Sequence, residues 1–423
     1  MHSGPEPAAS RYSWYVVTVL LAVYMVHHLD RMIVTLLLEP IGRDFDFSDS
    51  QLGLLAGLAY AVPFAIAGLP LGMLVDRVNR VRLLTVLVTV WSGLTTLAAF
   101  ANGFWTLLLA RVGVAAAEAG GTPTNVSIIS DQVPAARRST AFGVYYMGAA
   151  LGTIIGFSVA GAIAAKFGWR AGFLVAGLPG LLMAIILWRT VREPPRSDRA
   201  KHGATAPPLG PALRMIWDNK PALHVIMGTV VMGMLGIGLM TWLPTLMIRN
   251  HGSNVGQVGT IMAFAIYPLG PLASLIGGRL GDSLQARAPA SVARFLTMLA
   301  LVTLPAVVAG ILSESMTGLV VGFAIQAIAQ TMVSAPAYAS VMHHVAPGVR
   351  GLAASVMQVG TNVLGFGVGT QVIGVASDAL HAWSPDQSLR YAMLGFTVTA
   401  LWALGHFVLA ARAMRAYSSP ATA

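Results

Sequence analysis

The 423-residue chain contains no cysteine and has few charged side chains. Without cysteine there are no disulfides, no thiol catalysis and no thiolate metal sites, and redox chemistry gives no guide to the compartment. Charged residues make up 10% of the chain, against about 25% in an average soluble domain. Because 56% of the residues are apolar, the chain has too little polar surface to face water on all sides, which indicates a membrane protein.

The beginning of the sequence lacks a basic region and a small-residue cleavage site. Its first apolar run, from Tyr15 to Leu38, is too long for a signal peptide. We therefore expect this run to be retained as the first membrane helix. Since no secretory or organellar presequence is present, the sequence favours the inner (plasma) membrane of a bacterium.

Long apolar runs recur along the chain and predict an all-α membrane protein. We expect twelve transmembrane helices in two pseudo-symmetric six-helix bundles, near residues 14–38, 50–72, 83–101, 104–130, 139–164, 169–189, 221–248, 256–278, 292–312, 316–342, 350–376 and 390–411. The predicted domains are residues 1–190 and 221–423, joined by a proline-rich and basic cytoplasmic linker at 191–220. The end of the linker, from Leu209 to Trp217, is interpreted as a short surface helix or a disordered tether.

The net charge of +10 reports topology rather than a nucleic-acid partner. With the N-terminus inside, nineteen of the 26 lysines and arginines fall on the cytoplasmic side of the predicted helices and five on the outer side. This positive-inside bias predicts a multi-pass protein with both termini in the cytoplasm.

Two related loops follow the second and eighth predicted helices. The first contains Gly72, Asp76, Arg77 and Arg80, and a degenerate copy in the second half contains Asp282. Glycine lets helices approach, an acid caps a helix N-terminus, and arginine stays at the cytoplasmic face. We expect these five residues, called the latch residues below, to join neighbouring helices in one conformational state and to release them in another.

The first loop resembles the signature loop of the major facilitator superfamily, glycine-x-x-x-aspartate-arginine-x-glycine-arginine. Asn79 stands where the signature usually has glycine, and asparagine tolerates a left-handed backbone. The resemblance extends over the whole chain in helix number, central linker and paired loops. It implies a transporter that works by alternating access, most often as a monomer.

Four charged residues lie well inside predicted helices, where each costs about 2.5–3.5 kcal/mol at a helix centre. They are Asp30 and Arg31 in the first helix, and Arg111 and Glu118 in the fourth. The rise per residue puts Asp30 and Arg111 at similar depth on the outer side and Glu118 near the midplane, so Arg111 can pair with either carboxylate. Arg31 points about 100° away from Asp30 around its helix.

This arrangement suits proton coupling, because burial raises the pKa of a carboxylic acid in general and a neighbouring arginine lowers it. We assign proton coupling to Asp30, Glu118 and Arg111, and the anionic group of a substrate to Arg31 and Arg111. The alternative is a salt-bridge network that only holds the N-terminal half together. His27 is a further candidate for substrate binding or a proton relay, although a satisfied interior histidine fits its position better.

The second half has no acid near the membrane midplane, and its interior polar groups are uncharged. Gln326, Gln330 and Asn362 are the substrate-binding candidates there, and methionines enrich the seventh helix. A cavity with one charged wall and one apolar wall suits an amphiphile. Gly120, Gly121 and Pro123 predict a loosened fourth helix that acts as a hinge or, as the alternative, packs closely against a neighbour. Gly148, Gly152 and Gly156 predict a small-residue packing face in the fifth helix.

Several segments resemble the spinster subfamily, which includes sphingolipid transporters. The segments are His28-Leu-Asp30-Arg31, Phe47 to Leu55, Arg111 to Pro123, and Phe167 to Arg170 followed by Gly177 to Gly180. The resemblance implies a proton-linked carrier of a lipid-like amphiphile, with Asp30, Arg31, Arg111 and Glu118 as functional positions. His27 and His28 depart from the asparagine and aromatic residue that the subfamily usually has there.

The sequence thus predicts a proton-coupled secondary transporter of an amphiphilic or lipid-derived organic anion resembling a sphingoid phosphate. Its partners are the substrate and membrane lipid, the proton is the coupling ion, and no cofactor or metal is expected. Two alternatives stay open: a proton symporter for a sugar acid or other small carboxylate, and a membrane sensor that does not transport. An enzyme is not expected, since no phosphate-binding loop, metal cluster or nucleophile–base pair stands out.

Overall fold

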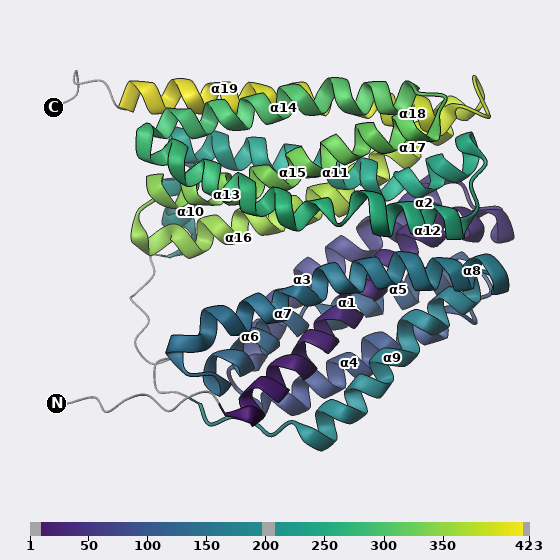
Figure 1. The fold of residues 1–423 in the computed structure, drawn as a ribbon, viewed down its shortest axis with the longest axis horizontal. Helices are drawn as coiled ribbons and strands as arrows, with labels where there is room; N and C mark the ends of the chain where they lie inside the picture. Colours follow the sequence, from purple (N-terminus) through teal and green to yellow (C-terminus); the bar gives the residue numbers. More distant parts are fainter. Residues whose placement is uncertain (1–9, 197–207, 418–423) are drawn as a thin grey trace. The chain divides into compact units, whose positions relative to one another are not determined.

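The computed structural model describes residues 10–196 and 208–417, and in these two ranges all regular structure is helical (Figure 1). Residues 197–207, in the middle of the predicted linker, lie outside the described residues. The described residues group into two compact units. The first comprises residues 10–47, 59–196 and 253–264, and the second comprises 48–58, 208–252 and 265–417. The predicted domain boundaries stay a prediction, and two short segments, 48–58 and 253–264, group with the other half.

The first unit contains the helices of the N-terminal half and one short helix from beyond the linker. They are α1 (Arg11–Phe45), α3 (Leu58–Val75), α4 (Arg80–Ala98), α5 (Phe104–Glu118), α6 (Gly121–Gln132), α7 (Arg138–Ile155), α8 (Gly161–Phe167), α9 (Trp169–Thr190) and α12 (Val255–Ile261). A 3-10 turn (Ala135–Arg137) precedes α7, and a π-helical turn (Gly156–Ala160) joins α7 to α8.

The second unit contains the remaining helices. They are α2 (Asp49–Ala56), α10 (Leu209–Asp218), α11 (Lys220–His251), α13 (Leu269–Arg287), α14 (Pro289–Leu312), α15 (Met316–His344), α16 (Arg350–Gly360), α17 (Thr370–His381), α18 (Ser388–Phe396) and α19 (Thr399–Tyr417). A π-helical turn (Met262–Ile266) follows α12, a 3-10 turn (Pro347–Val349) precedes α16, and a π-helical segment (Thr361–Gly369) joins α16 to α17. The helix α10 confirms the surface-helix interpretation of the linker end.

Within the described ranges, eleven helical spans are long and apolar enough to cross a membrane. The twelve predicted helices include one more, the fourth, at 104–130. This region contains two successive helices, α5 and α6, with a turn at Ala119 and Gly120. Pro123 has no N–H to donate to the carbonyl of Ala119, so the backbone ladder weakens at this turn. The predicted loosening of this helix is confirmed, and it explains why neither piece is long enough to count as a span.

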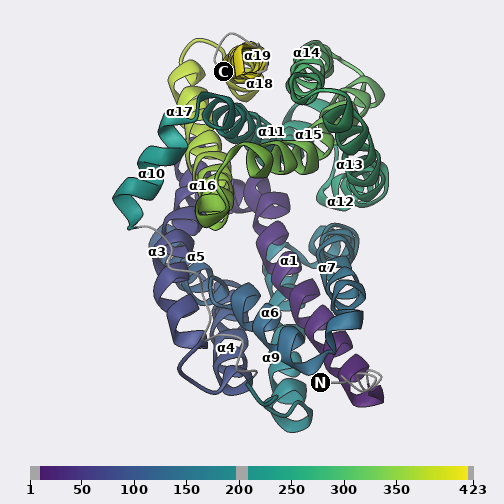
Figure 2. The same ribbon diagram turned by 90° about the vertical axis from the view of Figure 1, so that its left-hand side faces the viewer.

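Glycines set the spacing between α1 and α7, as the sequence predicts. A Cβ at Gly152 would lie 2.1 Å from the carbonyl oxygen of Met25, and one at Gly148 would lie 2.6 Å from that of Leu21. Only glycine lets the two backbones come this close. Figure 2 shows α1 beside α7 and α9, so α1 is packed along its length and holds its polar residues inside the first unit.

Two glycines of α9, Gly177 and Gly180, pack in the same way against Ser92 and Thr96 of α4. Trp91 of α4 is fully buried and belongs to the hydrophobic core of the first unit. These contacts fix α4 against α9. They therefore build the rigid frame on which the buried polar side chains of the first unit are placed.

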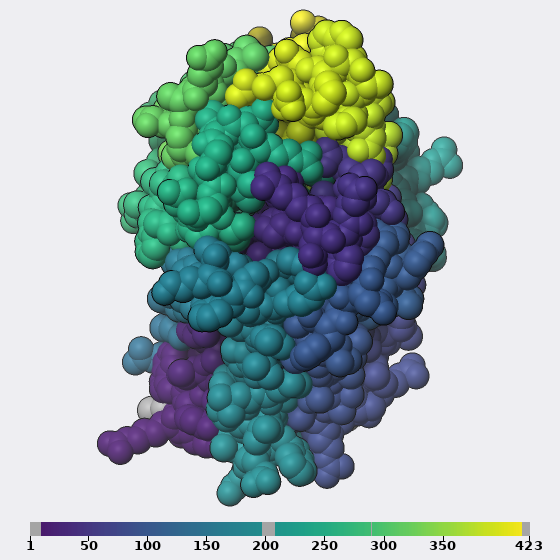
Figure 3. Space-filling model, turned by 90° about the vertical axis from the view of Figure 1, so that its right-hand side faces the viewer, coloured from purple at the N-terminus to yellow at the C-terminus, as the bar shows by residue number. Residues whose placement is uncertain are grey.

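The short helix α2 is anchored inside the second unit. It packs against α17. In Figure 3, purple atoms of the N-terminal part of the chain adjoin yellow atoms of the C-terminal part. A Cβ at Gly374 of α17 would lie 2.4 Å from the carbonyl oxygen of Asp49. The irregular residue Gly57 (φ −104°, ψ −96°) separates α2 from α3. The candidate membrane span Asp49–Val75 is thus divided between the two units at the helix break around Gly57.

Candidate functional site

Tyr60 of α3 stands at the centre of the buried polar groups in the first unit. Its side chain is buried, and its hydroxyl donates a hydrogen bond of 2.6 Å to Oε2 of Glu118 on α5. The guanidinium carbons of Arg31 and Arg111 lie 4.9 Å and 4.6 Å from the centroid of its ring. One tyrosine therefore contacts two cations and one carboxylate, which come from α1 and α5.

Glu118 has no exposed surface. Its Oε2 also lies 3.8 Å from Nδ1 of His27, which is too long for a hydrogen bond but short enough for attraction if the imidazole is protonated. Oε1 has no hydrogen-bond partner among the described residues. His27 is itself buried and packs edge-on against Trp91. The structure therefore places the predicted residue His27 against a carboxylate, inside the unit.

Asp30 is the most isolated of the buried charges. Its side chain is 1% exposed, and neither carboxylate oxygen has a hydrogen-bond partner of good geometry among the residues described. Thr95 of α4 lies close enough for a weak interaction, and Glu118 and Arg111 act on Asp30 electrostatically. Burying an ionised carboxylate without hydrogen-bond partners costs free energy.

Of the two carboxylates that the sequence offers to Arg111, Asp30 forms no hydrogen bond with it in this structure. Arg111, which is largely buried, donates instead from Nη2 to the backbone carbonyl of Arg31 at 3.4 Å. Arg31 was expected to point away from the pair, but it shares the ring of Tyr60 with Arg111. The two arginines are thus held together by the aromatic ring and the backbone of α1, rather than by the carboxylate of Asp30.

Aromatic side chains extend this site along α1 and α7. The rings of Tyr24 and Tyr145 are stacked with centroids 4.5 Å apart, and Tyr24 also stacks on His27. The hydroxyl of Tyr145 accepts a hydrogen bond of 3.1 Å from Asn125 of α6. These contacts hold His27 in place beside Glu118. The sequence analysis missed them because uncharged aromatic residues in apolar helices are ordinary core residues.

The candidates of the second unit lie around a glycine of α11. A Cβ at Gly236 would lie 2.7 Å from an amide atom of both Gln326 and Gln330 on α15. Both glutamines have a buried Oε1 without a hydrogen-bond partner among the described residues. Asn362 lies on the π-helical segment and donates to the carbonyl of Gln358 at 3.0 Å. The structure brings the two glutamines together as hydrogen-bond acceptors, and their role stays a prediction.

Arg80 is the best-connected latch residue, and it is fully buried. Its guanidinium forms ion pairs with Asp131 of α6 and with Glu193, which follows α9. It also donates to the carbonyl of Pro194 at 2.8 Å. The sequence analysis did not find Asp131 and Glu193 as its partners. Arg80 therefore ties α4, α6 and the chain after α9 together within the first unit.

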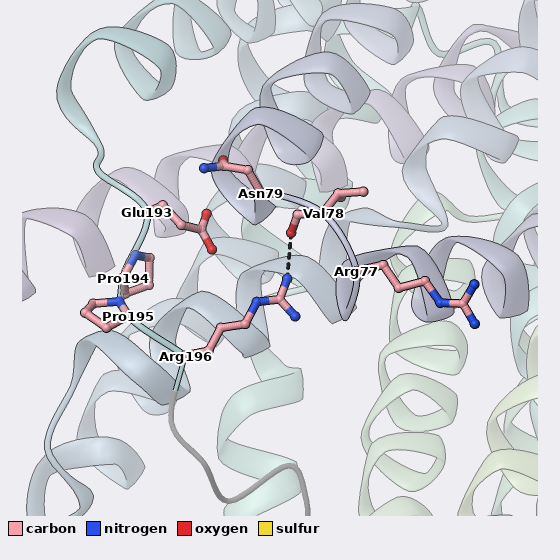
Figure 4. A pocket seen from close by; sticks show the side chains of 7 residues that line it. All are labelled: Arg77, Val78, Asn79, Glu193, Pro194, Pro195 and Arg196. Carbon is pink, nitrogen blue, oxygen red and sulfur yellow. Dashed lines mark hydrogen bonds between the residues drawn. The ribbon is translucent and has the colours of Figure 1, made fainter.

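A second arginine, Arg196, binds the backbone carbonyls at and just after the end of α3. Figure 4 shows Arg196 pointing to the carbonyl of Val78, and its guanidinium also donates to the carbonyls of Val75 and Asp76. These oxygens are the unpaired acceptors of a helix C-terminus, where a cation is favourable. Val78, Arg196 and Arg77 are among the residues that line an open cavity of about 490 Å³, in which the side chain of Arg77 extends away from Arg196.

The other latch residues make fewer contacts. The side chains of Asp76 and Asp282 are exposed, and Gly72 has open space where a Cβ would stand. The close approach that explains a glycine is instead found at Gly277 and Gly281 of α13, which lie against α15. The concerted action of Gly72, Asp76, Arg77, Arg80 and Asp282 stays a prediction.

A further charge cluster, which the sequence analysis missed, fixes α2 in the second unit. Arg249 of α11 forms a two-pronged ion pair with Asp49 at 2.8 Å and 2.9 Å. Asp378 of α17 accepts hydrogen bonds from the backbone N–H groups of Asp49 and Ser50 at the start of α2. The position of Asp378 at the end of a predicted helix was a usable signal, since acids in such positions cap helix N-termini. Its partner 329 residues earlier was not visible in the sequence.

Residues 20–370 match the family model of the Major Facilitator Superfamily. The chain belongs to this superfamily. It is therefore a multi-pass membrane protein and a secondary transporter, from a family of transporters rather than enzymes. Among the described residues, no group of three or more histidines, cysteines or acids could hold a metal ion.

Within the superfamily, the chain is similar to two curated relatives and to a solved structure. It is similar to an MFS-type efflux pump of Mycolicibacterium smegmatis, with 30% identity over 91% of this chain and 89% of the relative. Its fold matches a solved bacterial homologue of the human lysosomal transporter Spinster with a TM-score of 0.86, 28% identity, and coverage of 99% of this chain and 100% of the other. A hexuronate transporter of Bacillus subtilis is 24% identical over 63% of this chain and 64% of the relative. The likeness to spinster proteins, expected from the sequence, is confirmed.

Proposed function

We propose that the protein carries an amphiphilic or lipid-derived organic anion together with protons, by alternating access. The observation that carries this proposal is the group around Tyr60, where two arginines and Glu118 meet on one side chain. Arg31 and Arg111 bind the anionic head of the substrate in this proposal, and Asp30 and Glu118 take up the protons.

The charges of the four residues make the coupling quantitative. Asp30, Glu118, Arg31 and Arg111 sum to zero when both carboxylates are ionised, and to two positive charges when both are protonated. A buried surplus of positive charge is costly unless an anion enters. A phosphate monoester carries about −1.5 to −2 charges at pH 7, which matches the fully protonated site. Proton binding and anion binding therefore favour each other, and this mutual effect is what couples them.

An apolar tail on the substrate is supported by the second unit and by the spinster likeness. The second unit offers the uncharged acceptors Gln326 and Gln330 rather than further charges. Two methionines of α11, Met232 and Met234, are packed inside the unit, while Met227 and Met240 are only partly buried. The head group is thus assigned to Arg31 and Arg111 of the first unit. We place the protein in a bacterial inner membrane with both termini in the cytoplasm, surrounded by lipid as a monomer.

The test is transport by the purified protein in liposomes. A labelled sphingoid phosphate and a labelled hexuronate are followed side by side, with and without an imposed pH gradient. We expect the lipid phosphate to move faster along a proton gradient and to lose this advantage when a protonophore collapses the gradient. If neither compound moves faster with the gradient than in empty liposomes, the proposal is wrong.

A proton symporter for a sugar acid is the second candidate. It is supported by the likeness to a hexuronate transporter and by the paired amide acceptors of α15, which suit sugar hydroxyl groups. Gradient-driven movement of the hexuronate alone would select this candidate and keep the proton chemistry. A membrane sensor would bind one of the compounds without moving either, and neutralising Asp30 would leave that binding unchanged.

A further inference from the structure

We infer that Tyr60 is the positioning residue that links the protonation of Glu118 to the placement of both substrate-binding arginines. This inference rests on the proposed function and assigns it a mechanical connection. Tyr60 is suited to the role because it is the side chain in contact with all three groups. Its hydroxyl reaches Glu118 at 2.6 Å, and both guanidiniums lie within 5 Å of its ring centroid, at 4.6 Å and 4.9 Å.

The hydrogen bond of the Tyr60 hydroxyl depends on the charge state of Glu118. While the carboxylate is ionised, the tyrosine O–H donates to Oε2, and such a charge-assisted bond is strong and short. Once a proton sits on Glu118, the same two oxygens share one bond in which either partner donates, or the tyrosine O–H turns away. The contact therefore weakens when Glu118 is neutralised, and the tyrosine ring gains freedom to move.

The ring of Tyr60 passes that freedom to the arginines. A guanidinium over an aromatic face is attracted by the ring quadrupole, and the attraction grows when water is excluded. Arg31 and Arg111 are like charges that repel each other, so a shared ring also screens them at close range. Movement of the ring after protonation shifts both cations at once. The ring thus carries both arginines to the position that receives an anion in the protonated state, and keeps them out of that position in the ionised state.

A tyrosine that only fills space would make the same ring contacts without the link to Glu118. Two substitutions separate these roles. Tyr60→Phe keeps the ring and both cation contacts and removes only the hydroxyl. Tyr60→Leu removes the ring as well. Tyr146→Phe is the matched control, because Tyr146 lies on α7 with a half-exposed side chain and contacts the ring of Tyr24 rather than the arginines.

The measurement is the pH profile of anion uptake in liposomes for the wild type and the three variants. Without the donor from Tyr60, ionised Glu118 is less stable, so it takes up its proton at a higher pH. We expect the pH of half-maximal uptake in Tyr60→Phe to rise by about one unit, the size expected from one hydrogen bond to a charged group. The KM for the anion at saturating proton concentration is expected to stay close to that of the wild type.

Tyr60→Leu is expected to show the same shift of the pH profile and a KM for the anion raised by about fivefold or more, since both cation contacts are lost. The control Tyr146→Phe keeps the wild-type profile. An unchanged pH profile in Tyr60→Phe, beside a pH-dependent wild type, overturns the inference and leaves the proposed function standing. A wild type whose uptake does not depend on pH overturns both.

Discussion

Asp30→Asn is expected to lose accumulation of the anion against its gradient while it still exchanges labelled for unlabelled anion across the membrane. The amide resembles the protonated acid, so this position no longer changes charge during the cycle. Asp30 has no hydrogen-bond partner of good geometry to lose among the described residues, so the fold should tolerate the change. The coupling free energy between linked sites is typically about 1–3 kcal/mol, or about 5- to 150-fold in affinity. Accumulation of the anion is expected to decrease by a factor in that range.

The measurement compares net uptake driven by a pH gradient with equilibrium exchange, in the same liposomes. Asp218→Asn is the matched control, because Asp218 is an exposed carboxylate that pairs with Arg214 of its own helix at 3.6 Å. Full accumulation by Asp30→Asn would show that Asp30 does not carry a coupled proton. Loss of exchange together with uptake would assign Asp30 to binding rather than to coupling.

Arg80→Ala is expected to destabilise the first unit strongly. The guanidinium is buried, and its removal takes away the ion-pair partner of Asp131 and of Glu193, whose side chains are 11% and 25% exposed. Breaking a buried ion pair from one side costs about 3–5 kcal/mol, and the partial exposure of Glu193 favours the lower end. A loss of about 3 kcal/mol lowers Tm by roughly 6–12 °C for a unit of this size.

The check is thermal unfolding in detergent, followed by tryptophan fluorescence. Arg82→Ala provides the comparison, since Arg82 lies two residues further along α4 with an exposed side chain. We expect the control to unfold within about 2 °C of the wild type, because exposed charges contribute little. Equal Tm values for Arg80→Ala and the wild type would mean that the ion pairs of Arg80 do not stabilise the unit.

The sequence predicted the membrane fold and the buried charges because both follow from large energies. Apolar runs of this length indicate membrane-spanning helices. A charged side chain inside such a helix costs so much free energy that it indicates a functional or paired residue. Asp30, Arg31, Arg111 and Glu118 were found in this way, and the structure brings them into one group. The sequence left Arg111 able to pair with either carboxylate, and the structure adds its contact with the backbone carbonyl of Arg31, which depth along a helix could not predict.

Tyr60 was missed because a single tyrosine in an apolar helix costs little and gives no charge signal. A usable signal existed, since a buried tyrosine hydroxyl usually requires a partner and Tyr60 lies about ten residues into its predicted helix, near the depth of Glu118. The partners of Arg80 were missed for another reason. Glu193 lies beyond the last turn of α9, and only the folded chain shows that it returns to the start of α4.

The grouping of α2 with the second unit was also beyond the sequence. The apolar run from residue 50 to 72 reads as one continuous helix, and glycine at position 57 is only one of several in it. The break at Gly57 and the capping of Asp49 and Ser50 by Asp378 depend on contacts across more than 300 residues. Such contacts are set by tertiary packing, which local periodicity does not report.

The central claim is that protons and the anion bind together, and the count of protons taken up on binding tests it most directly. The purified protein is placed in weakly buffered detergent solution near neutral pH with a pH indicator, and sphingoid phosphate is added while binding is followed by tryptophan fluorescence. We expect uptake of about one to two protons for each anion bound, because the proposal assigns the protons to Asp30 and Glu118. Asp30→Asn should take up fewer protons. Binding without any proton uptake, or with proton release, would contradict the account.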